Sequence, residues 1–121
     1  MNEKYNNIHL QYKIWLESDD GKGILGDGKW QILKAIKQEG SLMAACAKLG
    51  IAYRKTWDDL KKIEQMLGFK IIQKTRGGKE GGNTILSDEG IRLVEAFDHF
   101  HSNLDGLIQE KFRDMLSELK N

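Results

Sequence analysis

The spacing of apolar positions divides the chain into short helices and strands. The aromatic and β-branched run at residues 12–16 predicts a strand, and the turn-forming cluster at residues 19–23 ends it. Asp27 could cap a helix over about residues 28–38, which Gly40 would stop. The buried stripe of that helix would consist of Ile32, Leu33, Ala35 and Ile36.

Two further helices follow with almost no connecting chain. Ser41 begins the first of them and Gly50 ends it, and its apolar face is formed by Leu42, Ala45, Cys46 and Leu49. The next helix spans about residues 52–67 and stops at Gly68; its inner face carries Thr56, Leu60, Ile63 and Leu67. Two short helices joined by a tight turn predict a helix-turn-helix at about residues 41–67.

A hairpin and a long helix complete the predicted arrangement. Residues 70–75 and 84–86 predict two strands, joined by a glycine-rich tip that is too long for a tight turn and is expected to be mobile. Ser87 would cap the last helix. We therefore expect an α+β fold, a winged helix-turn-helix with an N-terminal strand. It would form one domain over residues 1–121, with the wing at about 70–86 and the long C-terminal helix at about 87–119.

The last helix keeps an apolar stripe to its end. At 1.5 Å per residue it would be roughly 50 Å long, which exceeds the width of a domain of this size. A stripe that continues past the domain needs a second surface, and a second copy of the chain would supply one. The alternative is that the helix bends along its own domain. The expected dimer-interface residues are Leu93, Phe97, Phe100, Leu104, Leu107, Ile108, Phe112 and Met115.

Composition places the chain among ordinary globular domains. Its 121 residues are 40% hydrophobic and 31% charged. The longest apolar run, residues 42–47, is far too short to span a membrane, and the first residues carry no apolar signal segment. The single cysteine, Cys46, permits no internal disulfide. We therefore expect a cytoplasmic protein without membrane contact.

Charge is distributed unevenly, although the net charge is only +1. Residues 48–79 hold nine basic and three acidic side chains, a net charge of +6, and the rest of the chain has a net charge of −5. This separation favours a surface for a polyanion over a merely solvated basic helix.

The outer face of the third helix carries side chains suited to duplex DNA. Arg54 can reach guanine edges with two hydrogen bonds, and Tyr53 or Trp57 can contact thymine methyl groups or sugars. The lysines suit phosphates, as do Ser41 and the amides behind it at a helix N-terminus. The candidate DNA-binding residues are Ser41, Tyr53, Arg54, Lys55, Trp57, Asp58, Lys61, Lys62, Lys74, Arg76, Gly78 and Lys79.

Other kinds of site find little support. Residues 23–29 match the first part of a phosphate-binding loop, but Trp30 stands where Ser or Thr must hold magnesium. His99 and His101 are two positions apart on a helix, so they face different ways and do not form a metal pair. No nucleophile and base are convincingly paired. We expect no enzyme activity, no cofactor and no metal.

One dispersed pattern and two continuous blocks of the sequence resemble known regulators. The general pattern consists of Gly40-Ser41-Leu42-Met43-Ala44-Ala45, Leu49-Gly50-Ile51, Leu60, Ile63 and Leu67-Gly68. It resembles the winged helix-turn-helix of LysR-type regulators. Two blocks look more specifically like the DNA-binding domain of the molybdate-responsive ModE family. They are residues 51–58, similar to that family's I-S-Y-K-x-A-W-D, and residues 75–87, similar to its T-G-G-K-G-G-G-x-x-L-T.

The resemblance, from about residue 10 onward, implies a homodimeric transcription factor that binds a palindromic DNA operator. It places Tyr53, Arg54, Lys55 and Trp57 at or beside the DNA, although Trp57 could equally brace the helix against the wing. In full-length family members a molybdate-binding region follows, and because this chain stops at Asn121 we do not expect molybdate sensing. Two alternatives stay open: a protein-interaction module, and a dimer that binds a small anionic effector, each without DNA affinity.

Overall fold

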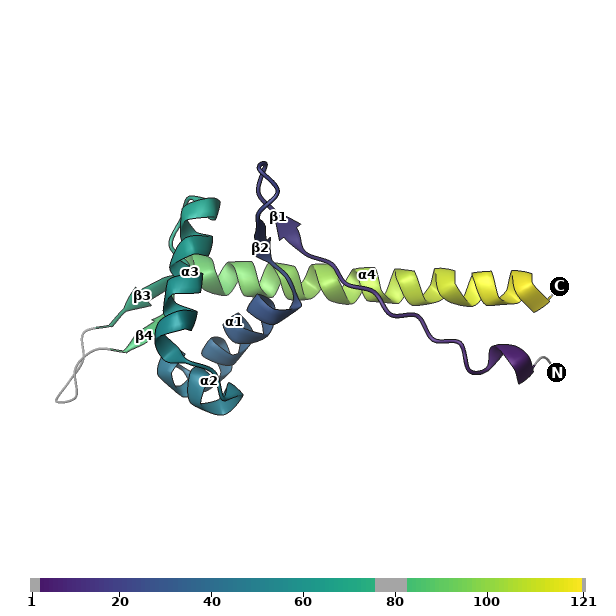
Figure 1. Ribbon diagram of the computed structural model, residues 1–121, viewed down its shortest axis with the longest axis horizontal. Helices are drawn as coiled ribbons and strands as arrows, with labels where there is room; N and C mark the ends of the chain where they lie inside the picture. Colours follow the sequence, from purple (N-terminus) through teal and green to yellow (C-terminus); the bar gives the residue numbers. More distant parts are fainter. Residues whose placement is uncertain (1–2, 76–82, 121) are drawn as a thin grey trace.

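A computed structural model of the chain describes residues 3–75 and 83–120. Its elements, in chain order, are a 3₁₀ turn at Glu3–Tyr5, β1 (Leu16–Glu17), β2 (Gly23–Leu25), α1 (Asp27–Glu39), α2 (Leu42–Leu49), α3 (Tyr53–Leu67), β3 (Ile72–Lys74), β4 (Thr84–Leu86) and α4 (Asp88–Lys120). Helices α1 to α3 and the β3–β4 hairpin gather around one end of α4, which extends away from them as a long rod (Figure 1). The predicted α+β fold is confirmed.

Local signals set the helix-turn-helix pair as predicted. The Ser41 hydroxyl accepts a hydrogen bond from the Ala44 N–H at 3.1 Å, which caps α2. Gly50 ends α2 with φ +68°, a left-handed conformation that glycine adopts without strain. Only Ile51 and Ala52 then separate Gly50 from α3. The short turn leaves α3 with one face against the core and the other outward.

The core lies between α1, α2, α3, the hairpin and the first turns of α4. Leu33, Ile36, Leu42, Leu60 and Ile71 are completely enclosed. Three predicted inward positions differ: Ile32 and Leu67 are only half-buried, and Leu49 is exposed. Trp30 takes a core position that the apolar spacing did not assign to it, because its ring reaches α4 and packs edge-on against Phe97 at 5.4 Å.

The N-terminal strand differs from the prediction. Of residues 12–16 only Leu16 enters a strand, and the expected terminating turn is instead the tip of a small β1–β2 hairpin that pairs Leu16 with Leu25. Ser18 N–H donates to Lys22 O, and Gly21 closes the turn at φ +82°. The run before Leu16 is used for packing, since Ile14 lies against the core and Tyr12 reaches α4.

The N-terminus of α1 also differs from the prediction. Its cap residue is Gly26, and Asp27 is the first residue of the helix. A side chain at position 26 would place its Cβ 3.1 Å from the Cβ of Trp15. The close approach of these two segments therefore favours glycine at the cap.

The hairpin and α4 form one joined unit. β3 and β4 are antiparallel, with Ile72 opposite Leu86 and Lys74 opposite Thr84. Ser87 caps α4 as predicted, because its hydroxyl accepts from the Gly90 N–H at 3.0 Å. The expected mobile tip falls largely on residues 76–82, outside the described residues, as do the predicted sites Arg76, Gly78 and Lys79.

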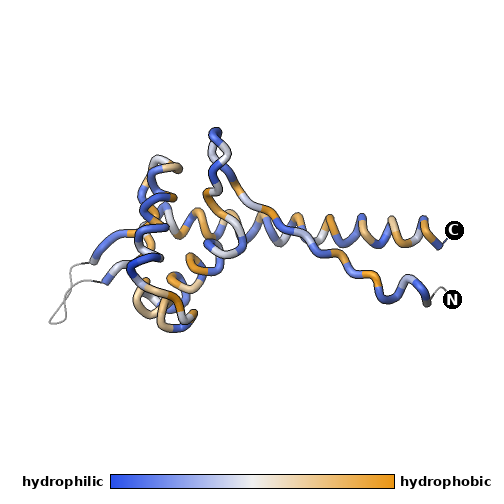
Figure 2. The backbone as a smooth tube through the Cα atoms, viewed as in Figure 1, coloured by the Kyte–Doolittle hydropathy of each residue, from blue (hydrophilic) through white to orange (hydrophobic). Residues whose placement is uncertain are grey.

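The N-terminal segment runs beside α4 toward its far end (Figure 1), and apolar positions recur along both (Figure 2). Tyr5 Oη donates to Leu119 O at 3.0 Å, and Tyr12 Oη donates to the Asp105 carboxylate, which raises the pKa of Tyr12 to about 12. His101 stacks on Trp30 at 4.6 Å. The segment thus holds α4 against its own chain over much of its length.

This packing divides the predicted dimer stripe. Phe97 is only 4% exposed and belongs to the core of its own chain, so almost none of its side chain is available to a partner. Leu93, Leu104, Ile108 and Phe112 are half-buried, whereas Phe100, Leu107 and Met115 stay exposed.

Of the helices described, none is both long enough and apolar enough to cross a bilayer.

Candidate nucleic-acid interface

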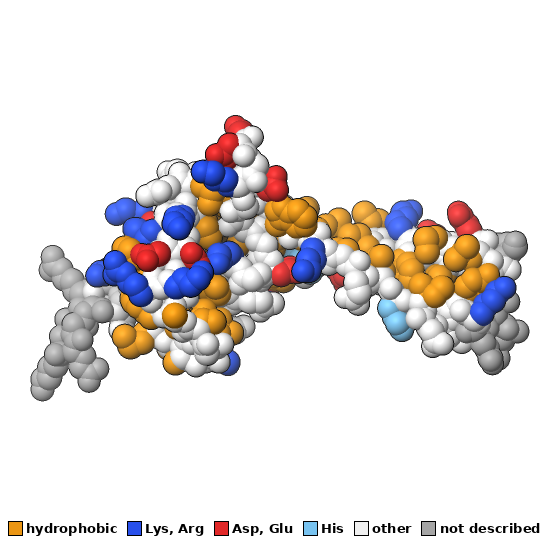
Figure 3. Space-filling model, in the orientation of Figure 1, with side chains coloured by type: hydrophobic (Ala, Val, Ile, Leu, Met, Phe, Trp, Pro, Cys, Tyr) orange, Lys and Arg blue, Asp and Glu red, His pale blue; other side chains and the backbone are white. Residues whose placement is uncertain are grey.

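Basic side chains gather over α3 and the adjoining hairpin (Figure 3). Helix α3 buries Thr56, Leu60 and Ile63, and this leaves the opposite side of the helix to solvent. The Thr56 hydroxyl donates to Ala52 O at 2.7 Å, so this polar residue can face the core with its hydrogen bond satisfied. The outward side carries Arg54, Asp58 and Lys62.

Arg54 is a highly accessible charged group of this surface, with 80% of its side chain exposed. Its guanidinium lies 5.0 Å from the centre of the Trp57 ring, and its Nε is 3.7 Å from an Asp58 carboxylate oxygen. Exposed contacts of this kind contribute roughly 1 kcal/mol or less, so they orient Arg54 without preventing it from taking another partner.

Trp57 both braces the helix and shows part of its ring. It is half-buried and packs against the core, and both the Arg54 guanidinium, at 5.0 Å, and Lys61 Nζ, at 5.5 Å, lie close to the centre of its ring. Together with the strand residues Ile72 and Thr84 it lines a hollow between α3 and the hairpin. Both roles considered from the sequence are therefore compatible with its position.

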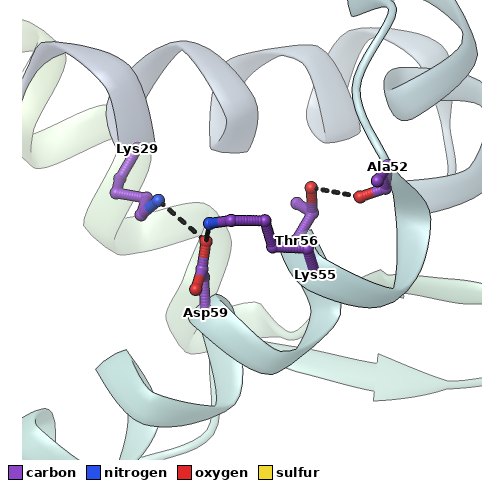
Figure 4. A network of polar contacts seen from close by, with 5 residues as sticks. All are labelled: Lys29, Ala52, Lys55, Thr56 and Asp59. Carbon is purple, nitrogen blue, oxygen red and sulfur yellow. Dashed lines mark hydrogen bonds and ion pairs between the residues drawn. The ribbon is translucent and has the colours of Figure 1, made fainter.

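An ion-pair network joins α3 to α1 (Figure 4). Asp59 Oδ2 accepts from Lys55 Nζ at 3.1 Å and from Lys29 Nζ at 3.2 Å. The hydrogen bond from Lys55, aided by Lys29, lowers the pKa of Asp59 below its ordinary value against the opposing effect of burial. Lys55 thus shares one carboxylate with Lys29, and the three side chains together keep a net positive charge.

Glu64 fastens α3 to the start of the hairpin. Its side chain is only 7% exposed and accepts hydrogen bonds from Ile71 N–H at 2.8 Å and Ile72 N–H at 3.0 Å, while Lys61 Nζ lies 2.8 Å from its other oxygen. Burial alone raises the pKa of Glu64, but these three partners outweigh it and hold the pKa below its ordinary value. A second link runs from Tyr53 Oη to Thr84 Oγ1 at 3.2 Å.

The structure brings most of the predicted DNA-binding residues together. Tyr53, Arg54, Trp57 and Lys61 lie on α3 beside the hairpin, and Lys74 extends from β3 toward the same hollow. Lys62 is exposed on α3, and the Ser41 hydroxyl is occupied by its capping bond.

Two residues of this region were missed from the sequence. Glu64 was missed because a charged residue beside Ile63 is ordinarily read as solvent-facing. Lys70 lies just before β3 and lines the hollow, and its only signal was membership of the basic segment. Within the two described ranges, no three His, Cys, Asp or Glu residues lie together as metal ligands would.

Comparison with known proteins points to the same region. Residues 28–91 match the model of bacterial regulatory helix-turn-helix proteins of the LysR family. The chain is 32% identical over 87 residues to the DNA-binding transcriptional dual regulator ModE of Escherichia coli K12, covering 72% of this chain and 31% of that protein. It is 30% identical over 85 residues to the molybdenum transport protein ModE of Azotobacter vinelandii, covering 70% and 31%.

A third relative is the molybdenum-pterin-binding protein MopB of Rhodobacter capsulatus, 30% identical over 73 residues, which are 60% of this chain and 27% of that protein. The chain therefore matches less than a third of the length of each of these relatives. The resemblance to the ModE-type DNA-binding region is confirmed by these matches.

Proposed function

Because the chain belongs to the LysR family of bacterial regulatory helix-turn-helix proteins, we propose that it is a sequence-specific transcriptional regulator that binds duplex DNA as a homodimer. The observation that carries this proposal is the exposed basic side of α3, the second helix of the helix-turn-helix pair, held beside the β3–β4 hairpin by Glu64 and Tyr53. An α-helix fits the major groove of B-form DNA, and a neighbouring hairpin can then follow the backbone.

The roles within this interface follow from side-chain chemistry. Arg54 reads a guanine edge, with Asp58 and Trp57 orienting its guanidinium in the free protein. Tyr53 and Trp57 approach sugars or thymine methyl groups. Phosphate contacts come from Lys55, Lys61, Lys62, Lys74 and the N-terminus of α2 at Ser41, together with Arg76, Gly78 and Lys79 of the hairpin tip.

Replacing Arg54 by lysine should weaken discrimination at one base pair of the operator. Lysine keeps the positive charge and can still donate to guanine, but it lacks the planar, fixed geometry of a guanidinium, so part of a preference worth about 1–3 kcal/mol is lost. Operator sequences selected by wild-type protein from random duplexes, followed by competition with single-base changes, would measure this. Equal preference in wild type and Arg54→Lys would show that Arg54 does not read a base.

The homodimer is proposed to form through the exposed flank of α4, which includes Phe100, Leu107 and Met115 beside the half-buried Leu93, Leu104, Ile108 and Phe112. Phe97 supports this flank from within the core. A two-fold dimer predicts a palindromic operator whose half-sites lie about one helical turn, or a multiple of it, apart.

Leu107→Asp should weaken the dimer. The side chain is 51% exposed in the single chain, and a carboxylate buried there against a partner would cost about 2 kcal/mol or more, roughly a thirtyfold increase in the dissociation constant. Sedimentation velocity over a concentration series would measure it. Met43→Asp makes the same change at an exposed apolar residue of α2 and should leave the dimer intact. Equal sedimentation of both variants and wild type would contradict the proposed interface.

A second candidate is a protein-interaction module without DNA affinity. It is favoured by the exposed apolar side chains near the base of α4, among them Trp15 and Phe100.

Fluorescence anisotropy of a labelled random duplex, from low to high salt, separates the two functions. Binding that weakens steeply with salt supports the regulator, which would act on bacterial DNA in the cytoplasm and have no catalytic role. A folded dimer that ignores DNA at every salt concentration supports the interaction module.

A further inference from the structure

A hollow of about 370 Å³ lies between α3 and the hairpin. Its apolar side is formed by Trp57 and Ile72, and its polar side by the remaining lining residues, which are Lys61, Lys70, Gln73, Lys74 and Thr84. Since one water needs only about 10–15 Å³ of volume on this measure, the hollow is large enough to admit a phosphate group.

The two walls of the hollow are held in place in the free protein. Glu64 binds the N–H groups of Ile71 and Ile72 at the base of β3, and Tyr53 Oη is 3.2 Å from Thr84 Oγ1 on β4. Both contacts bridge α3 and the hairpin. A ligand that enters the hollow therefore meets a preformed site, and little ordering of the protein opposes its binding.

The charge of the hollow comes chiefly from two lysines. Lys61 is paired with Glu64 at 2.8 Å, so its charge is largely compensated. Lys70 and Lys74 are exposed, and none of the described residues that line the hollow is acidic. Two ammonium groups for which the described part of the chain shows no acidic partner, beside an amide and a hydroxyl, suit an anion with several acceptor oxygens.

We propose that this hollow is the binding site for one DNA backbone phosphate, which Lys70 and Lys74 bind together. The inference rests on the proposed function, and it adds Lys70 to the DNA-binding residues. Its consequence is geometric: a phosphate held between α3 and the hairpin fixes the depth at which Arg54, one turn from Trp57 on the same helix, meets the base edges. The contact carries no sequence information of its own.

The test compares Lys70→Ala, Lys74→Ala and the double variant with wild type, using anisotropy of a labelled random duplex over a series of KCl concentrations. Lys37→Ala is the matched control, since it removes one positive charge from α1, where Lys37 pairs with Glu95 of α4. Circular dichroism melts confirm that each variant is folded. Each phosphate that a protein neutralises contributes about 0.9 to the slope of log K against log salt concentration.

Because the two lysines share one phosphate, the double variant should lose about 0.9 from this slope, and the effects of the single variants on affinity should not add. Lys37→Ala should keep the wild-type slope. An unchanged slope in the double variant would overturn the inference. Additive effects with a loss of about 1.8 would also overturn it, because the lysines would then hold two separate phosphates.

Free phosphate offers the same chemistry as the backbone, and a second measurement separates the two sources. When inorganic phosphate replaces chloride at equal ionic strength, the melting temperature of wild type should rise no more than that of the double variant. A rise in wild type alone, with an unchanged DNA slope in the double variant, would assign the hollow to a free anion. If wild type did not bind DNA at all, the proposed function itself would be overturned. If wild type bound DNA in a way that depends on Arg54 and the double variant bound it with the same salt slope, only the proposed phosphate site would be overturned.

Discussion

Replacing Gly90 by alanine is expected to lower the free energy of unfolding by about 3 kcal/mol or more. Gly90 lies in the first turn of α4 and is buried against the segment that leads into β3. A Cβ at this position would lie 2.2 Å from the carbonyl oxygen of Ile71 and 3.0 Å from its carbonyl carbon. Both are backbone atoms, so the clash cannot be relieved by a change of rotamer.

The backbone near Ile71 is itself constrained, which makes the clash costly. The Ile71 carbonyl accepts from Ser87 N–H at 2.9 Å, and its own N–H donates to the buried Glu64. Moving Ile71 away from Gly90 would therefore strain the cap of α4 and the link between α3 and the hairpin at the same time.

Urea denaturation followed by circular dichroism would measure the effect of Gly90→Ala. Gly28→Ala is the matched control, because position 28 lies in α1 with no neighbouring atom within 4 Å of the added Cβ. The control should be neutral or slightly more stable, since alanine favours the helix more than glycine does. Equal stability of the two variants would mean that α4 and the segment at Ile71 do not approach each other as described.

Glu64→Ala is expected to cost about 3 kcal/mol of folding free energy, the second large effect. The substitution leaves the N–H groups of Ile71 and Ile72 without their acceptor and removes the partner of Lys61. Glu64→Gln should cost less, because its carbonyl oxygen can still accept a hydrogen bond. Chemical denaturation at pH 7 would rank wild type, Gln and Ala in this order, and an Ala variant as stable as wild type would contradict it.

The stability difference between wild type and Glu64→Gln should depend on pH, and its direction follows from the pKa of Glu64. The pKa of Glu64 is lower in the folded protein than its ordinary value of 4.5, so the folded state binds the proton less tightly than the unfolded state. The stabilisation is fully present above pH 4.5 and is lost as the pH falls through the folded pKa. The stability gap between wild type and Glu64→Gln should therefore narrow on acidification below pH 4.5. A gap that stays constant there would show that the carboxylate is not held by these partners.

Much of the local architecture was predictable from short-range signals. Gly40, Gly50 and Gly68 end their helices in the left-handed conformation, and Ser41 and Ser87 cap the helices that follow them. These outcomes depend on contacts within three or four residues of each other, so they do not require knowledge of the rest of the fold. The concentration of positive charge in residues 48–79 was equally visible, and most of the candidate site follows from placing that segment on α3 and β3.

The candidate site was less predictable in its pairings. Lys55 and Lys61 look alike in the sequence, yet Lys55 donates to Asp59, which also accepts from Lys29 of α1, whereas Lys61 pairs with the buried Glu64. Lys70 lines the hollow only because the segment before β3 returns along α3. The acidic partners are near in the chain, but Lys29 of α1 and the N–H groups of Ile71 and Ile72, which complete these pairings, come from other elements, and residue type does not specify them.

By itself the sequence determined where α1, α2 and α3 end, which serines cap α2 and α4, that a helix-turn-helix precedes a hairpin, and that one segment carries the excess of positive charge. Only the tertiary structure decided which similar residues have different environments. Phe97 is enclosed by Trp30 while Phe100, three residues later, is exposed, and Glu64 is buried because two N–H groups of the next segment need its oxygens. The physical reason is that helix capping and periodicity act over one turn of chain, whereas burial and hydrogen-bond partnership depend on which distant segments pack together.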